Sequence, residues 1–356
     1  MADARPENLP AGDLEEVLEA VGENWEELRG ARIFLTGGTG FFGKWLLESL
    51  AWADRRLGLG VRATILTRDP EAFRAAQPAL AGYPGFDFAR GDVRSFAFPE
   101  GTFTHLIHAA TEASAALNRK QPRLMFETVA EGTRRALDFA ARAGVGKLLL
   151  TSSGAVYGTQ PSHLTHVPEE YPGAPDPLAP GSAYGEGKRV SELLCGLAAG
   201  PRLEVKIARC YAFVGPHLPL DLHFAVGNFL RDGLEGREIA IGGDGTPRRS
   251  YLYMTDLAAW LWTILLKGAP SRAYNVGSED DLSIREVAEA VAGAFDPAPD
   301  VRVARTPDPA AVASPARYVP STRRAREELG LGQRVPFAEA LARTVRWNRQ
   351  LTTRLP

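Results

Sequence analysis

Residues Ile33–Gly43 read IFLTGGTGFFG, and this stretch decides the fold of the chain. A short apolar run typical of a buried strand ends in a group of glycines and leads into a helical pattern. Backbone N–H groups at the start of a helix have no partner within it, and the aligned peptide dipoles favour an anion there. The glycines allow a tight turn, the approach of phosphates and close helix–strand packing. The stretch therefore predicts a turn that binds the pyrophosphate of a nicotinamide dinucleotide.

Composition and charge limit the possible partners. The length of 356 residues predicts two domains or one large domain with a smaller lobe. The composition, 45% hydrophobic and 24% charged, is typical of a globular protein. The net charge of −2 favours neither nucleic acid nor an anionic membrane as partner. The N-terminus carries no signal-peptide pattern and no apolar run reaches membrane-spanning length, so we expect a cytoplasmic protein. Cys195 and Cys210 predict no disulfide framework and no metal site, and we expect both to be buried apolar residues.

Strand and helix patterns alternate through much of the chain, which predicts an α/β fold of Rossmann type, a doubly wound parallel sheet covered on both faces. We expect strands at 32–36, 61–67, 86–89, 105–108, 147–151, 205–208 and 274–276, and helices including 42–53, 123–143, 183–198, 282–295 and 336–349. Residues 31–210 with 250–278 are predicted to form the dinucleotide-binding domain. Residues 211–249 with 279–350 are predicted to form a smaller, mostly helical C-terminal substrate lobe.

Residues 1–30 are expected to form an N-terminal tail and a docking helix. Residues 1–12 are predicted to be disordered, and Asp13 with Glu16 resembles a capping box that would start the helix. The apolar residues that follow fall on one helical stripe, which we expect to pack on the next domain: Leu14, Val17, Leu18, Val21, Trp25 and Leu28.

Tyr184 and Lys188 lie four residues apart at the start of a predicted helix, so they share a face. A nearby ammonium stabilises a phenolate and is expected to lower the pKa of the tyrosine from its usual value near 10. Such a phenol can act as a general base toward a substrate alcohol. Ser152 and Ser153 follow a predicted strand, where the active sites of open parallel sheets lie. A hydroxyl at that edge can hold the reacting oxygen.

Several motifs together resemble those of the extended short-chain dehydrogenase/reductases, and among them the nucleotide-sugar epimerase/dehydratase group. They are the glycine turn, Gly91–Asp92–Val93, His108–Ala109–Ala110, Thr151–Ser152–Ser153 with Val156–Tyr157–Gly158, and Tyr184-x-x-x-Lys188. The resemblance runs from about residue 31 to past residue 276. UDP-glucuronate decarboxylases and UDP-sugar 4-epimerases carry similar motifs, and the segment 182–189 is most like that of the decarboxylases.

The resemblance implies roles for the matching positions. Contacts to the cofactor are implied for Gly37, Gly40 and Gly43 at the pyrophosphate, for Asp92 and Val93 at the adenine, and for Ala109 and Ala110 at the ribose. Phe41, Phe42 and Thr111 are implied as further cofactor contacts. Ser153 is implied as the catalytic hydroxyl, Tyr184 as the base and Lys188 as the ligand of the nicotinamide ribose. Asn228 and Arg249 match positions that grip the nucleotide diphosphate, for which the planar fork of arginine is well suited. A homodimer is also implied.

The chain departs from these relatives in ways that leave the reaction open. Gly154 and Ala155 stand where dehydratases carry an Asp-Glu pair and decarboxylases carry a glutamate at the second position. Ala212 replaces an asparagine that usually contacts the sugar diphosphate. Glu112, at the mouth of the predicted cleft, is a candidate for a substrate-binding acid or base. His217 is a second candidate.

The end of the second predicted strand bears on the choice of cofactor. Thr67 occupies the place where NAD-binding folds usually carry an acid, and Arg68 follows it, which favours NADP slightly, whereas Asp69 could still reach a ribose hydroxyl and favour NAD. We therefore expect NAD(P).

The hypothesis that fits these patterns best is a nucleotide-diphosphate-sugar enzyme that forms a transient 4-keto sugar, with epimerisation favoured. Alternatives are a dehydratase or decarboxylase that uses Glu112, an NADPH-dependent 4-keto-sugar reductase, and a non-enzymatic nucleotide-binding sensor.

Overall fold

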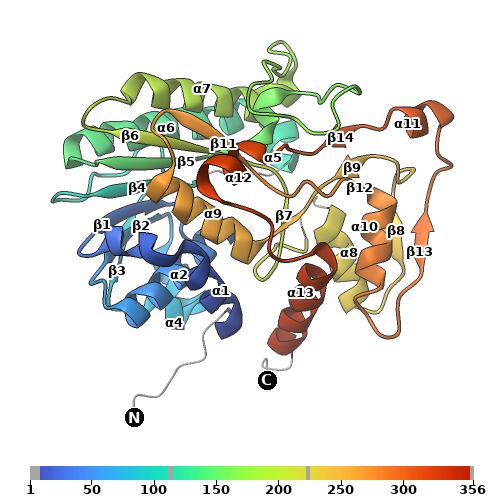
Figure 1. Cartoon of the computed structure of the whole chain (residues 1–356), viewed down its shortest axis with the longest axis horizontal. Coiled ribbons are helices and arrows are strands. Elements are labelled where there is room, and N and C mark those ends of the chain that lie inside the picture. The colour runs from blue at the N-terminus through green and yellow to red at the C-terminus, as the bar shows by residue number, and fades with distance from the viewer. Residues whose placement is uncertain (1–8, 111–114, 222–224, 353–356) are drawn as a thin grey trace.

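A computed structural model describes residues 9–110, 115–221 and 225–352 of the chain (Figure 1). Its centre is a sheet of seven parallel strands. From one edge to the other these are β11 (Arg272–Val276), β6 (Glu204–Cys210), β5 (Lys147–Ser153), β4 (His105–His108), β1 (Arg32–Thr36), β2 (Arg62–Thr67) and β3 (Phe86–Arg90). The strand order reverses between β1 and β4, and ligands of open parallel sheets bind beyond the carboxyl ends of the strands at such a point.

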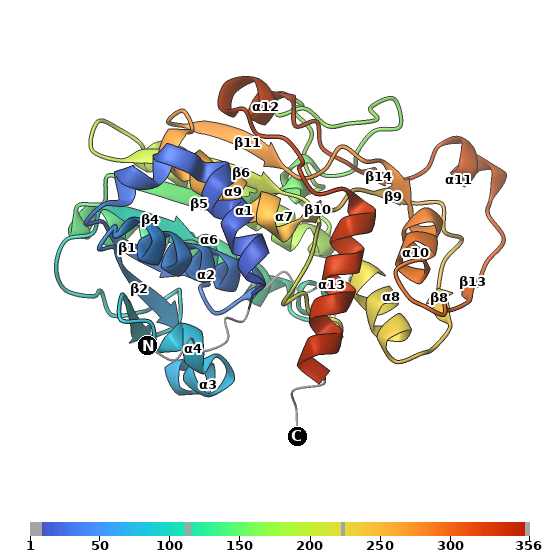
Figure 2. The same cartoon turned by 60° about the horizontal axis from the view of Figure 1, so that its bottom comes forward.

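Helices cover both faces of the sheet, as Figures 1 and 2 show. One face carries α2 (Phe41–Leu57), α9 (Met254–Lys267) and α1 (Ala11–Val21), and the other carries α6 (Pro122–Ala143) and α7 (Ala183–Ala198). Side chains of a strand alternate between the two faces. Ile33 and Leu35 accordingly join the core under α2 and α9, whereas Phe34 packs in the core under α6, with its ring 4.4 Å from that of Phe139.

The predicted Rossmann-type α/β fold is confirmed, and most predicted elements lie close to the observed ones. The helix 183–198 has the bounds expected from its apolar period. The helix after the glycine turn extends four residues beyond the predicted end, and β5 and β6 reach two residues further toward the cavity than their apolar runs suggested. Two short helices, α3 (Pro70–Ala76) and α4 (Pro78–Ala81), connect β2 to β3.

The N-terminal segment differs from the prediction in two ways. Residues 9–12 are ordered, because α1 begins at Ala11 and the buried Leu9 donates its N–H to Glu48 at 2.8 Å. The capping box at Asp13 is wrong, since Asp13 lies inside the helix and accepts hydrogen bonds from the Tyr253 hydroxyl at 2.6 Å and from Arg343 at 2.9 Å. The helix does dock on α2 and α9, as expected, and a 3-10 helix (Gly22–Leu28) continues it.

Most of the remaining elements gather beyond the carboxyl ends of the strands (Figure 2). Helices here are α8 (Ala225–Leu234), α10 (Ile284–Ala292), α11 (Pro309–Ala313) and α13 (Phe337–Thr352). By contrast, α12 (Arg323–Leu329) packs alongside β11, and α5 (Ala115–Lys120) precedes α6. Short strands form three small sheets: β7 (Phe213–Val214) with β10 (Leu252–Tyr253), β8 (Ile239–Ile241) with β13 (Val301–Val303), and β9 (Arg248–Arg249) between β12 (Leu282–Ser283) and β14 (Arg317–Tyr318). The division of the chain into two domains at the predicted boundaries stays a prediction.

Two further expectations concern the buried cysteines and the membrane. Cys195 and Cys210 are both buried, as predicted. Within the described ranges, none of the helices has both the length and the apolar character needed to cross a bilayer.

Candidate active site

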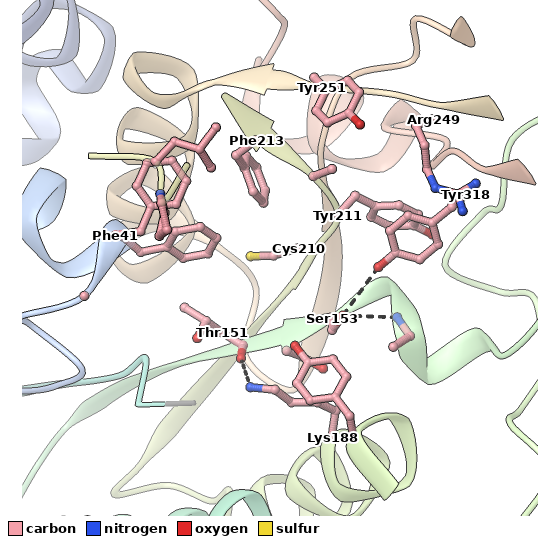
Figure 3. Close-up of a pocket in the computed structure, with 18 of the residues that line it drawn as sticks. Phe41, Thr151, Ser153, Lys188, Cys210, Tyr211, Phe213, Arg249, Tyr251 and Tyr318 are labelled. Carbon is pink, nitrogen blue, oxygen red and sulfur yellow. Dashed lines mark hydrogen bonds between the residues drawn. The ribbon is translucent and has the colours of Figure 1, made fainter. Parts of the chain in front are cut away.

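A cavity of about 700 Å³ opens at the carboxyl ends of the central strands, between the sheet and the smaller elements (Figure 3). The glycine turn contributes Gly37, Gly40, Phe41 and Phe42, and Ala109 follows β4. The end of β5 and the start of α7 contribute Ser153, Tyr184 and Lys188 to the same cavity, and the small sheet of β9 and β14 contributes Arg249 and Tyr318. The cavity therefore brings the predicted dinucleotide turn and the predicted catalytic residues together.

The glycine turn leaves room for a pyrophosphate because positions such as 37 and 43 cannot carry side chains. Gly37 adopts a left-handed φ of 75°, and a Cβ there would collide with the backbone of Ala109. A Cβ at Gly43 would collide with the carbonyl of Gly37. Gly40 is the N-cap of α2 and supplies no capping side chain, so the first N–H groups of the helix are available to an anion.

The other predicted cofactor residues lie around this turn. Ala109 and Ala110 donate their N–H groups to the carbonyl and the hydroxyl of Thr36 at 3.1 and 3.2 Å, which fixes the strand end beside the turn. Thr111 and Glu112 lie outside the described residues, so the structure does not place the candidate acid.

Arg68, Asp92 and Val93 lie near the ends of β2 and β3 and do not line the cavity. Asp92 accepts hydrogen bonds from Arg94, which hold the pKa of its carboxyl below the usual value. Asp69 is engaged as the N-cap of α3, where it accepts the N–H of Ala72 at 3.1 Å.

A buried chain of hydroxyls and one imidazole joins the glycine turn to α7. The Thr36 hydroxyl lies 2.8 Å from Nδ1 of His108, whose Nε2 lies 3.1 Å from the Thr133 hydroxyl on α6. Thr133 in turn contacts the Ser191 hydroxyl on α7 at 2.7 Å. Burial lowers the pKa of His108 to about 3, so its ring is neutral. Because the hydroxyl of Thr133 donates its single proton to the carbonyl of Val129 at 2.8 Å, it accepts from Nε2 of His108, and Nδ1 accepts from Thr36.

The three predicted catalytic residues meet at the end of β5. Lys188 is buried and donates from Nζ to the carbonyl of Thr151 at 2.7 Å, and Nζ lies 5.8 Å from the centre of the Tyr184 ring. The Ser153 hydroxyl accepts the N–H of Ala155 at 3.1 Å and lies near the phenol of Tyr184, whose pKa it lowers. The geometry is that of a hydroxyl and a phenol converging on one point.

The pKa of Tyr184 differs from the sequence-based expectation. Desolvation inside the cavity raises it to about 12, and the nearby Ser153 hydroxyl offsets this only in part. Burial also lowers the pKa of Lys188 to about 8. In the protein alone the tyrosine is therefore a neutral phenol, because burial outweighs the neighbouring ammonium.

Ser152, the other hydroxyl predicted at this strand end, has a structural role. It donates to Glu192 of α7 at 2.5 Å, and Glu192 forms an ion pair with Arg209 of β6 at 2.7 Å. Arg209 also donates to the Tyr157 hydroxyl at 2.8 Å. This cluster fixes α7 against β5 and β6, and therefore also fixes the positions of Tyr184 and Lys188 in the cavity.

Residues 33–277 match the model of the NAD dependent epimerase/dehydratase family. The chain belongs to this family. The membership confirms the resemblance predicted from the motifs, the assignment as an enzyme and the expectation of NAD(P) as cofactor.

Relatives of the chain act on different sugar nucleotides. UDP-glucuronic acid decarboxylase 5 of Arabidopsis thaliana is 30% identical over 315 residues, 87% of each chain. The dTDP-glucose 4,6-dehydratase of Streptomyces antibioticus is 28% identical over 326 residues, 89% of this chain and 92% of that one. A solved dTDP-glucose 4,6-dehydratase of Streptomyces venezuelae with NAD bound is 26% identical, with a TM-score of 0.72 over 90% of this chain and 97% of the other. UDP-glucose 4-epimerase of Thermotoga maritima, 22% identical, shares the fold with a TM-score of 0.72 over 90% of this chain and 99% of its own.

Two tyrosines that the sequence analysis missed occupy the part of the cavity where dehydratases of this family are expected to carry acids. The Tyr211 ring lies against Gly154, where a Cβ would be 2.7 Å from Cζ of the ring. Tyr211 also packs on Tyr318, with ring centres 4.6 Å apart, and the Tyr318 hydroxyl lies 3.4 Å from that of Ser153 (Figure 3). Gly154 was the available signal, since a missing side chain beside the predicted catalytic serine leaves room for another residue.

The remaining predicted substrate residues are split between the cavity and its surroundings. Arg249 lines the cavity beside Tyr318, and Ala212 lines it as well. Asn228 lies on α8 and is half-buried, but it is not among the residues that line the cavity. His217 also lies outside the lining; it is buried 3.5 Å from Glu48, and burial lowers its pKa to about 3.

Proposed function

We propose that the chain is an NAD(P)-dependent enzyme that oxidises a hydroxyl of a nucleotide-diphosphate sugar to a transient ketone and reduces it again, with C4 epimerisation as the net reaction. The observation that carries this proposal is the convergence of Ser153 and Tyr184 in one cavity with the glycine turn. A protein that only binds a nucleotide has no need of a phenol and a hydroxyl aimed at the same point.

The dinucleotide would be held by the N–H groups after Gly37 and Gly40 and by Lys188 at the ribose. When bound, its nicotinamide ring supplies the capacity to accept and return a hydride. Ser153 would hold the reacting oxygen of the sugar, and Tyr184 would take its proton as the alcohol becomes a ketone. The same phenol would return the proton when the alcohol re-forms.

Arg249 is proposed to bind the diphosphate of the substrate, because its guanidinium lines the cavity and suits a phosphate group. Asn228 is retained as a predicted contact to the nucleotide.

Epimerisation is favoured because it needs no acid or base beyond the phenol. Gly154 and Ala155 supply no carboxylate, and the Tyr211 ring fills the space next to Gly154. Elimination of water or loss of a carboxyl group would need another residue, for which Glu112 remains the candidate. Reduction of a 4-keto sugar would need only Tyr184 and a supply of NADPH.

Mass spectrometry of the product tests these reactions against one another. The protein is incubated with NAD(P) and with glucose esters of UDP, dTDP, GDP and CDP, and with UDP-glucuronate. A product of unchanged mass and altered stereochemistry supports the proposal. Loss of water or of carbon dioxide, or consumption of NADPH in proportion to product, rejects it. Tyr184→Phe should lower kcat by about 10² to 10⁴, and full retention of activity would contradict the role of the phenol.

We also propose that the protein is a cytoplasmic homodimer that pairs through α6 and α7. Leu193 and Leu197 on α7 are 61% and 75% exposed, and Phe126 on the adjacent α6 is 36% exposed. These apolar side chains form a surface that a second copy would cover. Leu197→Asp should convert the dimer to a monomer in sedimentation experiments. Val312→Asp, at a 59% exposed residue on α11, serves as the matched control and should leave the mass unchanged.

A further inference from the structure

We infer that Asn118, on α5, is a positioning residue that holds Tyr184 in place at the start of α7. Its side-chain Oδ1 accepts the backbone N–H of Tyr184 at 3.1 Å, and its Nδ2 donates to the carbonyl of Gly181 at 2.7 Å. Asn118 and Tyr184 line the same cavity. The inference rests on the proposed function, in which Tyr184 is the base.

The start of α7 takes its cap from another part of the chain. The first N–H groups of a helix have no partner within it, and a serine at the N-cap usually accepts one of them. Ser182 is the N-cap residue of α7, yet its side chain makes no capping hydrogen bond. The amide of Asn118 accepts the N–H of Tyr184 instead, from a position 66 residues earlier in the sequence.

Two glycines make the first turns of α7 dependent on this cap. Gly185 and Gly187 are buried, and a Cβ at these positions would lie 2.8 Å from the carbonyl oxygen of Ala155 and 3.1 Å from Cβ of Val129 on α6. The close approach therefore requires glycine, although glycine is a poor helix former because its backbone loses more conformational freedom than that of other residues. The segment that carries Tyr184 is thus closely packed but weak as a helix.

The two hydrogen bonds fix the orientation of the Asn118 amide. The N–H of Tyr184 can only donate and the carbonyl of Gly181 can only accept, so the amide oxygen faces Tyr184 and the nitrogen faces Gly181. An aspartate at this position would keep the acceptor and lose the donor. A leucine, of similar size, would keep neither.

The backbone of α5 is tied to the helix that follows it. The N–H of Gln121 donates to the carbonyl of Leu117 at 2.8 Å, and the N–H of Met125 on α6 donates to the carbonyl of Gln121 at 3.0 Å. Since α6 packs along α7, Asn118 is fixed relative to the same helix pair that it caps. Loss of its amide would release the first turn of α7 while the rest of the frame stays in place.

Four proteins test the inference: the parent, Asn118→Leu, Asn118→Asp and Asn24→Leu. Asn118→Leu should lower kcat about tenfold for UDP-glucose, or for the other nucleotide sugar that the parent proves to convert, and leave KM nearly unchanged, because a small displacement of the base weakens its alignment in the transition state. Asn118→Asp, measured at its own optimum pH, should retain kcat within about threefold, since it keeps the acceptor for Tyr184.

Asn24→Leu is the matched control. The amide of Asn24 also donates to a helix carbonyl, that of Val21 at 2.8 Å, but Asn24 does not line the cavity. This variant should turn over as the parent does. An equal loss of kcat in Asn24→Leu and Asn118→Leu would show a general effect of losing such an amide and would overturn the inference.

Hydrogen exchange gives a measurement that does not depend on turnover. The amide of Tyr184 should exchange about tenfold faster in Asn118→Leu than in the parent, as followed by mass spectrometry of the segment 181–188, and Asn118→Asp should resemble the parent. Unchanged exchange, or faster exchange with unchanged kcat, overturns the inference. Faster exchange in a protein that converts no sugar nucleotide would support the cap while rejecting the proposed function, so the two failures are distinguishable.

Discussion

Gly154→Ala should destabilise the protein because the added methyl group would meet the Tyr211 ring. A Cβ at residue 154 would lie 2.7 Å from Cζ and 2.8 Å from both Cε atoms of Tyr211. Carbon atoms pack at about 3.5–4.0 Å, so the ring has to move by close to an ångström. Tyr211 is confined by Tyr318 on one face and approaches Gly277 with its Cβ, so it cannot retreat freely.

The magnitude follows from two contributions. Overpacking of this kind reduces the free energy of unfolding by about 1–3 kcal/mol, and a disturbed aromatic pair loses about 0.5–1.5 kcal/mol. The contributions overlap because both describe the same displaced ring, and we therefore expect a loss of about 2 kcal/mol. Urea denaturation followed by circular dichroism measures this loss, and the slope of the free energy with urea should stay unchanged.

A cycle with Tyr211→Leu identifies the cause. With the ring removed, Gly154→Ala should cost less than about 0.5 kcal/mol, as for a substitution that meets no obstacle. Gly181→Ala is the matched control, since a Cβ there would have no heavy atom within 4 Å. The reasoning is refuted if Gly154→Ala has the same effect with and without the Tyr211 ring, or if it has none at all.

Three further outcomes are expected. Burial raises the pKa of Glu48 to about 8, so the stability that this residue contributes is full below its unfolded pKa of 4.5 and is lost as the pH rises through 8. In urea titrations the parent should therefore lose about 5 kcal/mol relative to Glu48→Gln between these pH values, and parallel curves would contradict this. Arg68→Ala should weaken NADP binding about tenfold and leave NAD binding unchanged in calorimetry, because only the former has a 2′-phosphate for a guanidinium; equal effects would show that Arg68 does not select the cofactor. Thr133→Val should lower the free energy of unfolding by about 1–3 kcal/mol, because His108 and Ser191 lose a buried partner, and an unchanged urea midpoint would argue against this chain of hydrogen bonds.

The parts of the molecule that the sequence predicted well are those in which neighbours along the chain decide the outcome. The glycine turn, the helix 183–198 and the alternating strands follow from local spacing. The sequence also pointed to Ser153, Tyr184 and Lys188, because a strand end and a helix start lie in one α/β unit. These residues line one cavity, and their roles stay predictions.

The parts that escaped prediction depend on residues far apart in the chain. Tyr318 is 165 residues from the serine that it contacts, and no local pattern connects them. Asp13 has the spacing of a helix cap, yet a partner 240 residues away, Tyr253, draws it into the core. The pKa of Tyr184 was predicted from its neighbour Lys188, whereas burial by the whole fold decides it.

The imidazole between the glycine turn and α7 has a consequence for how ligands are received. Since His108 is uncharged and engaged at both nitrogens, the spacing between the dinucleotide cradle and the phenol is set by folding itself. The site is then preorganised before a ligand binds, and little of the binding free energy is used to order the polypeptide. A change of pH between mildly acidic and alkaline values leaves the two hydrogen bonds of His108 in place.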